Sequence, residues 1–307
     1  MILKRIYDES LAQASYLIGC ASTGEALIVD PNRDIDEYLR VAAEEKLRIT
    51  HVAETHIHAD FVSGALELAK GEGARLILSG EGGDDWQYAY ALDADANVVH
   101  DGDQFKIGNI EFEVLHTPGH TPEHVSFLVT DTARGEEPIG ILTGDFVFVG
   151  DVGRPDLLER AARQTGTMDT AARALFHSLR RFESLPDHLQ VWPGHGAGSA
   201  CGKAMSAVPT STVGYEKKFN PALAEKDEDR FVSSILSGQP EPPTYFAEMK
   251  RINREGPRLL SEVPEPEPAE ASALSQVLSS GALVVDTRPA SQFAAGHVPG
   301  TLNIPLN

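Results

Sequence analysis

The sequence predicts an α/β fold in which strands alternate with helices. Short runs rich in Ile, Leu, Val and Tyr recur along the first 200 residues, and segments with helical spacing of apolar residues separate them. Histidine and aspartate stand just after several of these runs, which is where loops held by a rigid sheet usually carry function. At 307 residues, the chain is long enough for two domains, or for one large domain with an appendage.

The predicted elements follow one another in a regular order. Strands are expected at 2–7, 14–20, 25–31, 48–55, 74–80, 106–119, 124–131, 139–145 and 188–196. Helices are expected at 34–46, at 61–73 and, in more than one segment, at 157–185. Asp34 is a candidate N-cap for the first helix, and the second helix ends in glycine, which often follows a helix.

The composition changes sharply at residues 263–272, where repeated Pro-Glu steps favour an extended, solvated linker. A short helix at 273–280 and a buried strand at 282–288 are expected beyond it. About 35 residues follow the linker, too few for an independent core. We therefore predict a first domain at 1–250, a linker at 251–272 and an incomplete domain at 273–307.

Charge and cysteine content exclude several functions. The chain has 26 Lys and Arg against 46 Asp and Glu, a formal net charge of −20. Such a surface repels phosphate backbones and anionic lipid, so neither nucleic acid nor a membrane is an expected partner. No apolar run is long enough to cross a bilayer. The N-terminal residues also lack the unbroken apolar stretch of a signal peptide. The two cysteines, Cys20 and Cys201, are too few for a disulfide framework and predict a cytoplasmic protein.

Four short motifs place histidine and aspartate at strand ends: THIHAD, HTPGHTPEH, LTGDF and VWPGHG. Their candidate metal-binding side chains are His56, His58, Asp60, His120, Asp145 and His195. A lone buried histidine is usually a hydrogen-bonded core residue. Four strand ends that present these residue types beside glycine predict instead a shared metal centre.

The order HxHxD, PGHT, TGD and PGH resembles the metallo-β-lactamase superfamily over about residues 1–250. The resemblance implies an αβ/βα sandwich with metal ions at one edge. Most members are zinc hydrolases with two metals, and their first motif reads HxHxDH. The last position of that motif is Phe61 here, so a second metal would lack a ligand and face a phenyl ring.

One branch of this superfamily, the persulfide dioxygenases, holds a single Fe(II), and the resemblance carries its ligands onto His56, His120 and Asp145. The segments GRPD at 153–156 and FNP at 219–221 are similar to that branch's GRTD-like and LNP elements. The run PGHGAGSACGK resembles bacterial persulfide dioxygenase–rhodanese fusions. The tail from VVDTR to NIPL resembles the opening half of a rhodanese domain, which would be incomplete because no cysteine follows residue 201.

The resemblance implies oxidation of a low-molecular-weight thiol persulfide, such as glutathione persulfide, by O2 to sulfite and thiol. Two imidazoles and one carboxylate leave open positions for both reactants on one Fe(II) per chain. His58, Asp60 and His195 would be remnants of a second site. His58 and Asp60 would orient the ligands, and His195 would form a hydrogen bond near the open positions. Arg154 would either bind a substrate carboxylate or form a surface salt bridge. Phe61 would exclude water from the open face of the iron.

Some alternatives stay open on the sequence alone. Cys20 is expected in the core, whereas Cys201 is either a small core residue or a thiol that handles sulfane sulfur. A zinc thioester hydrolase of the glyoxalase II type, acting on acylglutathione, shares the fold, but Phe61 argues against its binuclear centre. A purely structural metal with the tail as a docking module fits less well, since structural zinc closes its coordination with four ligands. The sequence does not identify the thiol carrier, and a homodimer is compatible with such a fold.

Overall fold

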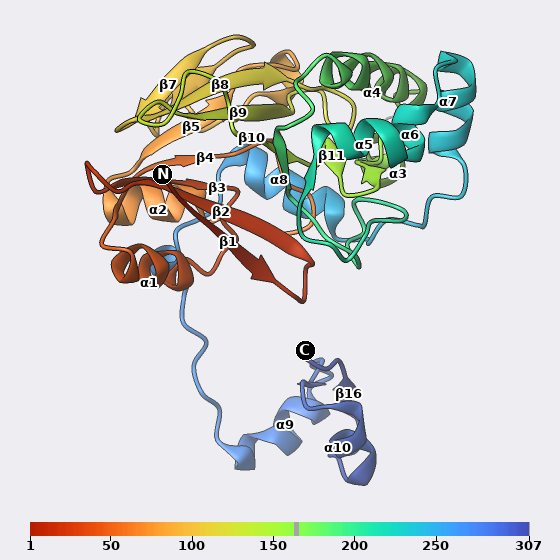
Figure 1. Ribbon diagram of the computed structural model, residues 1–307. Helices are drawn as coiled ribbons and strands as arrows, with labels where there is room; N and C mark the ends of the chain where they lie inside the picture. The colour runs from red at the N-terminus through yellow and green to blue at the C-terminus, as the bar shows by residue number, and fades with distance from the viewer. Residues whose placement is uncertain (163–165, 307) are drawn as a thin grey trace. The chain divides into compact units, whose positions relative to one another are not determined.

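The computed structural model describes residues 1–162 and 166–306. The chain divides into two compact units, Met1–Leu259 and Leu260–Asn307. In the first unit, two six-stranded sheets pack face to face, and helices cover their outer faces (Figure 1). The predicted αβ/βα sandwich is confirmed. Among the described residues, no helix combines the length and apolar character that a membrane span requires.

The first sheet begins antiparallel and continues parallel. In order, its strands are β1 (Ile2–Asp8), β2 (Gln13–Cys20), β3 (Glu25–Val29), β4 (Arg48–Ala53), β5 (Arg75–Ser79) and β6 (Asn97–Val99). The parallel pairs β3–β4 and β4–β5 need crossover connections, which contain α1 (Asp36–Glu44) and α2 (Ala65–Glu72). Because side chains alternate along a strand, Tyr16 and Ile18 of β2 face the second sheet while Leu17 faces the helices.

The first helix begins slightly later than expected. Ile35, not Asp34, stands at the position before α1, although Asp34 Oδ1 accepts a hydrogen bond from the amide of Asp36 at 3.1 Å. The predicted end of α2 is confirmed, since Gly73 follows it in the left-handed conformation at φ 66°.

The second sheet supplies the other half of the sandwich. Its strands, in order, are β14 (Ser211–Thr212), β13 (Gln190–Pro193), β10 (Gly140–Gly144), β9 (Val125–Asp131), β8 (Ile110–His116) and β7 (Gln104–Ile107). Four helices share a hydrophobic cluster with this sheet: α4 (Met168–Glu183), α5 (Val213–Phe219), α6 (Pro221–Ala224) and α7 (Glu228–Leu236). Smaller elements are η1 (Asp84–Trp86), β11 (Val147–Phe148), β12 (Asp151–Val152) and α3 (Leu157–Ala162). Helix α4 buries Leu175, Leu179 and Phe182 on one stripe against this sheet.

Helix α8 (Phe246–Glu255) corrects the predicted start of the linker at residue 251. Its Asn253 is buried because it binds a loop far away in the sequence. Asn253 Nδ2 donates to the carbonyl oxygens of His58 and Phe61 at 2.8 and 2.7 Å, and its Oδ1 accepts from the amide of Ser63 at 2.9 Å. The helix therefore belongs to the first unit and fixes the loop after β4.

We expect Asn253→Ala to lower the free energy of unfolding by about 1–3 kcal/mol, because it leaves buried backbone groups without partners. Denaturant unfolding of the full chain measures this loss. The control is Asn109→Ala, since Asn109 is exposed, and a change within about 0.5 kcal/mol is expected there. Equal effects of the two substitutions would contradict the role given to Asn253.

The second unit is small and largely exposed. It contains η2 (Leu260–Glu262), η3 (Ala271–Ala273), α9 (Leu274–Ser279), β15 (Val285–Asp286), α10 (Ala290–Ala295) and β16 (Leu302–Asn303). The strand predicted as buried at 282–288 is only Val285–Asp286, and Val285 is 39% exposed. Too few residues surround it to provide a covering layer. Strands β15 and β16 pair in parallel, and the rhodanese-like interpretation of this unit stays a prediction.

Candidate metal centre

The four motifs meet at one edge of the sandwich. The THIHAD loop follows β4, the HTPGHTPEH loop joins β8 to β9, and the other two motifs follow β10 and β13. Because β10 and β13 run parallel, their carboxyl ends open at the same edge. The candidate residues His56, His58, Asp60, His120, Asp145 and His195 are all buried.

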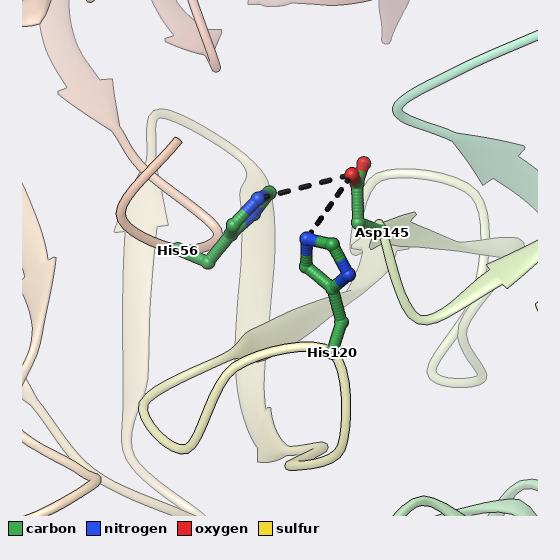
Figure 2. A group of neighbouring side chains, drawn as sticks. All are labelled: His56, His120 and Asp145. Carbon is green, nitrogen blue, oxygen red and sulfur yellow. Dashed lines mark ion pairs between the residues drawn. The ribbon is translucent and has the colours of Figure 1, made fainter. Parts of the chain in front are cut away.

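The first group consists of His56, His120 and Asp145, with one ligand-type atom from each lying within 4.8 Å of the others. The Nε2 atoms of His56 and His120 are 3.9 and 3.5 Å from Asp145 Oδ2 (Figure 2). Gly119 lets the second loop reach this point: its φ is 148°, and a Cβ there would lie 2.5 Å from Cβ of Leu175.

Each imidazole of this group is anchored through its other nitrogen. His56 Nδ1 is 3.0 Å from Thr55 Oγ1, and His120 Nδ1 donates to the carbonyl oxygen of Arg154 at 3.0 Å. Burial lowers the pKa of His120, and burial with the neighbouring histidines holds the pKa of His56 well below its ordinary value. Both rings are therefore neutral at neutral pH, and each directs the Nε2 lone pair towards Asp145.

The carboxylate of Asp145 completes a donor set that fits a metal ion. Both of its oxygens are buried without a hydrogen-bond donor in the part of the chain that the structure describes. A buried carboxylate is costly unless a cation or donors compensate it. Two neutral imidazoles around such a carboxylate fit a divalent transition-metal ion.

A hydrogen-bonded chain that the sequence interpretation missed holds His56 in place. Asp30 accepts from the amide and from the hydroxyl of Thr55 at 2.7 and 2.8 Å. The same hydroxyl oxygen faces His56 Nδ1. The only signal in the sequence is the aspartate that ends the strand before Pro31.

Thr55→Val should lower the affinity for the metal by about tenfold, as the loss of a partner behind a metal ligand commonly does. Competition with a chelator measures the affinity. Thr50→Val is a matched control, because Thr50 Oγ1 makes the same kind of contact with His51 Nδ1 at 2.9 Å outside the metal centre. An equal loss in both variants would show that the effect is not specific to His56.

His58 makes different contacts from those of His56. Its Nε2 is 3.2 Å from Asp30 Oδ1 and 3.0 Å from Glu54 Oε2, and its ring centroid is 4.4 Å from that of Phe61. Burial opposes a charge on His58, but these two carboxylates outweigh it and raise its pKa well above the ordinary value. His58 thus serves as a cation for Asp30 and Glu54, and Phe61 is buried against its ring.

A second group adjoins the first. Asp60, His195 and Cys201 place ligand-type atoms within 4.8 Å of one another. His195 Nε2 lies 3.2 Å from Asp60 Oδ2 and 3.5 Å from Asp145 Oδ1, and its Nδ1 donates to the carbonyl oxygen of Ala12 at 3.1 Å. Burial, with Asp145 and Asp60, raises the pKa of Cys201 to about 12. Cys201 is thus a neighbour of the centre, whereas Cys20 belongs to the core between the sheets.

The structure does not place Arg154 where a substrate carboxylate could reach it. Arg154 is 0% exposed, and its Nε and Nη2 donate to the two oxygens of Asp156 at 2.8 and 2.7 Å. It also donates to the carbonyl oxygens of Ala200 and Pro240. Asp156, two residues further along the GRPD segment, therefore binds the guanidinium group that the sequence interpretation assigned to a substrate carboxylate.

Two solved structures resemble the chain closely. A metallo-beta-lactamase from Staphylococcus aureus subsp. aureus COL is 45% identical with a TM-score of 0.86, and the match covers 100% of this chain and 85% of that one. The crystal structure of ETHE1 from Myxococcus xanthus is 29% identical with a TM-score of 0.67, and the match covers 83% of this chain and 98% of that one.

Curated relatives carry names from different activities. The persulfide dioxygenase ETHE1 of Bos taurus is 26% identical, over 75% of this chain and 78% of the relative. A hydroxyacylglutathione hydrolase of Rhodospirillum rubrum is 32% identical, over 59% of this chain and 60% of the relative. The chain spans about half of the length, 53%, of the beta-lactamase hydrolase-like proteins of Xylella fastidiosa that it also matches.

The family itself follows from a longer match. A sequence model described as the metallo-beta-lactamase superfamily matches residues 10–195, which is more than half of the chain and includes the candidate ligands of all four motifs. The chain belongs to the metallo-beta-lactamase superfamily.

Proposed function

We propose that the protein is an Fe(II)-dependent dioxygenase that oxidises a low-molecular-weight thiol persulfide with O2 to sulfite and the thiol. The observation that carries the proposal is the first group of ligands, two neutral imidazoles and one carboxylate without donors. The similarity to the bovine persulfide dioxygenase supports it. So does Phe61, which stands where the hydrolases that the sequence resembles have a metal-binding histidine.

In this proposal His56, His120 and Asp145 hold the iron. When bound, Fe(II) supplies the redox chemistry that allows O2 to react with a sulfur compound, and two histidines with one carboxylate are typical ligands of non-haem iron oxygenases. Thr55 and the carbonyl of Arg154 keep the two imidazoles in the orientation that directs Nε2 to the metal.

The overall reaction balances without a further reductant: RSSH + O2 + H2O gives RSH + H2SO3. The terminal sulfur loses four electrons, and O2 accepts them. Apolar side chains near the centre suit such a substrate. Phe61 packs on His58, and the ring centroid of Phe148 is 6.1 Å from that of His195. These rings limit the access of water to the reacting sulfur.

The iron-loaded protein, purified without oxygen, should consume one O2 for each sulfite formed from glutathione persulfide. An oxygen electrode and a sulfite assay measure the two quantities. Zinc-loaded protein is the control, because Zn²⁺ has no redox chemistry and should support no O2 uptake. Hydrolysis of an acylglutathione by the iron-loaded protein with no O2 uptake would refute the proposal.

A zinc-dependent thioester hydrolase of the glyoxalase II type is the second candidate. It is favoured by the 32% identity to the Rhodospirillum rubrum hydroxyacylglutathione hydrolase, and by Asp60 and His195, which remain in contact at 3.2 Å. The zinc-loaded protein of the preceding experiment tests it directly, since thioester cleavage in that form and no O2 uptake in the iron form would establish it.

A further inference from the structure

We propose that His124, to which the sequence interpretation gave no role, is a positioning residue that fixes the backbone of Asp145 and the ring of His56. The inference rests on the proposed metal ligands His56, His120 and Asp145, but not on the oxidation of persulfide. His124 ends the HTPGHTPEH motif directly before β9, and its side chain is buried. It acts through the ligands and is not one of them.

Both ring nitrogens of His124 make hydrogen bonds within the protein. Its Nε2 accepts from the backbone amide of Asp145 at 3.0 Å, which requires that Nε2 carries no proton. Its Nδ1 therefore carries the proton and donates to Thr117 Oγ1 at 2.8 Å. Burial and the neighbouring histidines hold the pKa of His124 well below its ordinary value. The ring is thus neutral at neutral pH, and neither nitrogen is left for a metal.

The carboxylate of Asp145 depends on its backbone for its position. Neither carboxylate oxygen receives a hydrogen bond from the residues that the structure describes. The backbone amide, by contrast, is held by His124 Nε2. The approach is close, since a Cβ at Gly144 would lie 2.8 Å from that nitrogen. Loss of the acceptor would leave the amide of Asp145 buried without a partner, so the loop after β10 would have to shift to satisfy it.

The neighbours of His124 hold the backbone on both sides of His56. The carboxylate of the preceding residue, Glu123, accepts from the amide of Ile57 at 2.8 Å. The amide of the residue that follows His124 donates to the carbonyl oxygen of Thr55 at 2.8 Å. Between these two contacts the ring of His124 stacks on that of His56, with centroids 5.1 Å and planes 28° apart. One short segment therefore links the backbones of all three proposed ligands.

Two substitutions by carboxamides separate the roles of the two nitrogens. In His124→Gln the side-chain oxygen reaches the position of Nε2 and can accept from the amide of Asp145. In His124→Asn the shorter side chain reaches only the position of Nδ1. Metal-free full-length protein is titrated with Co²⁺ in competition with a chelator. His124→Asn should weaken Co²⁺ binding by about 10–100-fold, whereas His124→Gln should stay within about threefold of the unmutated protein.

The visible absorption spectrum of bound Co²⁺ provides a second readout, because it depends on the geometry of the ligands. It should change in His124→Asn and not in His124→Gln, whereas a loss of stability alone would leave it unchanged in the folded protein. His51→Asn is the matched control, since His51 Nδ1 likewise contacts a threonine hydroxyl, Thr50 Oγ1 at 2.9 Å, outside the metal centre. It should bind Co²⁺ as the unmutated protein does.

Thermal unfolding followed by circular dichroism checks that each variant is folded. The proposal is overturned if folded His124→Asn keeps both the affinity and the spectrum, or if the two substitutions weaken Co²⁺ equally. If His124→Asn does not fold, His124→Gln still decides, because a loss there of more than about tenfold contradicts the role of the acceptor. Binding of Co²⁺ involves no O2, so failure here is distinguishable from failure of the proposed dioxygenase reaction.

Discussion

Asp145→Ala should remove the metal from the first group and abolish the proposed oxidation of persulfide. Asp145 is the only anionic ligand in that group, and both of its oxygens lie among the histidines with no hydrogen-bond donor among the residues that the structure describes. Loss of a partner behind a metal ligand costs 10–100-fold in affinity, so the loss of the ligand itself should cost more than about 100-fold. Metal analysis after dialysis and O2 uptake measure the two effects together.

The control for this variant is Asp229→Ala, which removes an exposed carboxylate that pairs with Arg173 on the surface. Such pairs contribute little to stability, so metal content and activity should be unchanged. An Asp145→Ala protein that remains folded and retains iron would show that the metal lies elsewhere. That result would also refute the assignment of His56 and His120 as metal ligands.

Arg154→Met should destabilise the first unit by about 3 kcal/mol, the lower part of the range for a broken buried ion pair. The substitution leaves Asp156 buried, although Arg160 still contacts that carboxylate at 3.0 Å. Arg154→Lys should restore only part of the stability, because an ammonium group cannot make the two parallel hydrogen bonds of the guanidinium. The midpoint and slope of denaturant unfolding give the free energies.

The same variants separate a structural role from a role in substrate binding. If Arg154 bound the substrate carboxylate, Arg154→Lys would raise KM and would not change the midpoint of denaturant unfolding. We expect the opposite: Arg154→Lys should lower the denaturant concentration at the unfolding midpoint, and the protein that is still folded should have an unchanged KM. A rise in KM without destabilisation would reinstate the interpretation made from the sequence.

Local patterns predicted most of the fold. The strands were recognisable because apolar residues alternate or form short runs between turn residues, and α2 ended where its glycine indicated. The family resemblance carried by the four motifs predicted that His56, His120 and Asp145 would meet. In the structure His56 follows a strand of the first sheet, whereas His120 and Asp145 follow strands of the second, and these strand ends lie at one edge of the sandwich. Their role as metal ligands stays a prediction that metal analysis must test.

Contacts between distant segments were not predictable from such patterns. Nothing near Asn253 indicates that it binds the loop of His58, since neither segment carries a motif for the other. Burial of Arg154 depends on Ala200 and Pro240, which the sequence gives no reason to place together. Cys201 likewise became part of the centre only when the fold brought its loop to Asp60.

The contact between α8 and the loop after β4 has a consequence for biosynthesis. All three residues of the first group precede residue 146, yet Asn253 bonds to a carbonyl 195 positions earlier. A ribosome releases the N-terminal half first, and closing so long a loop is entropically costly and slow. We therefore expect the nascent chain to bind its metal only after α8 has been translated. Metal insertion should thus occur late in synthesis, not when the ligands themselves leave the ribosome.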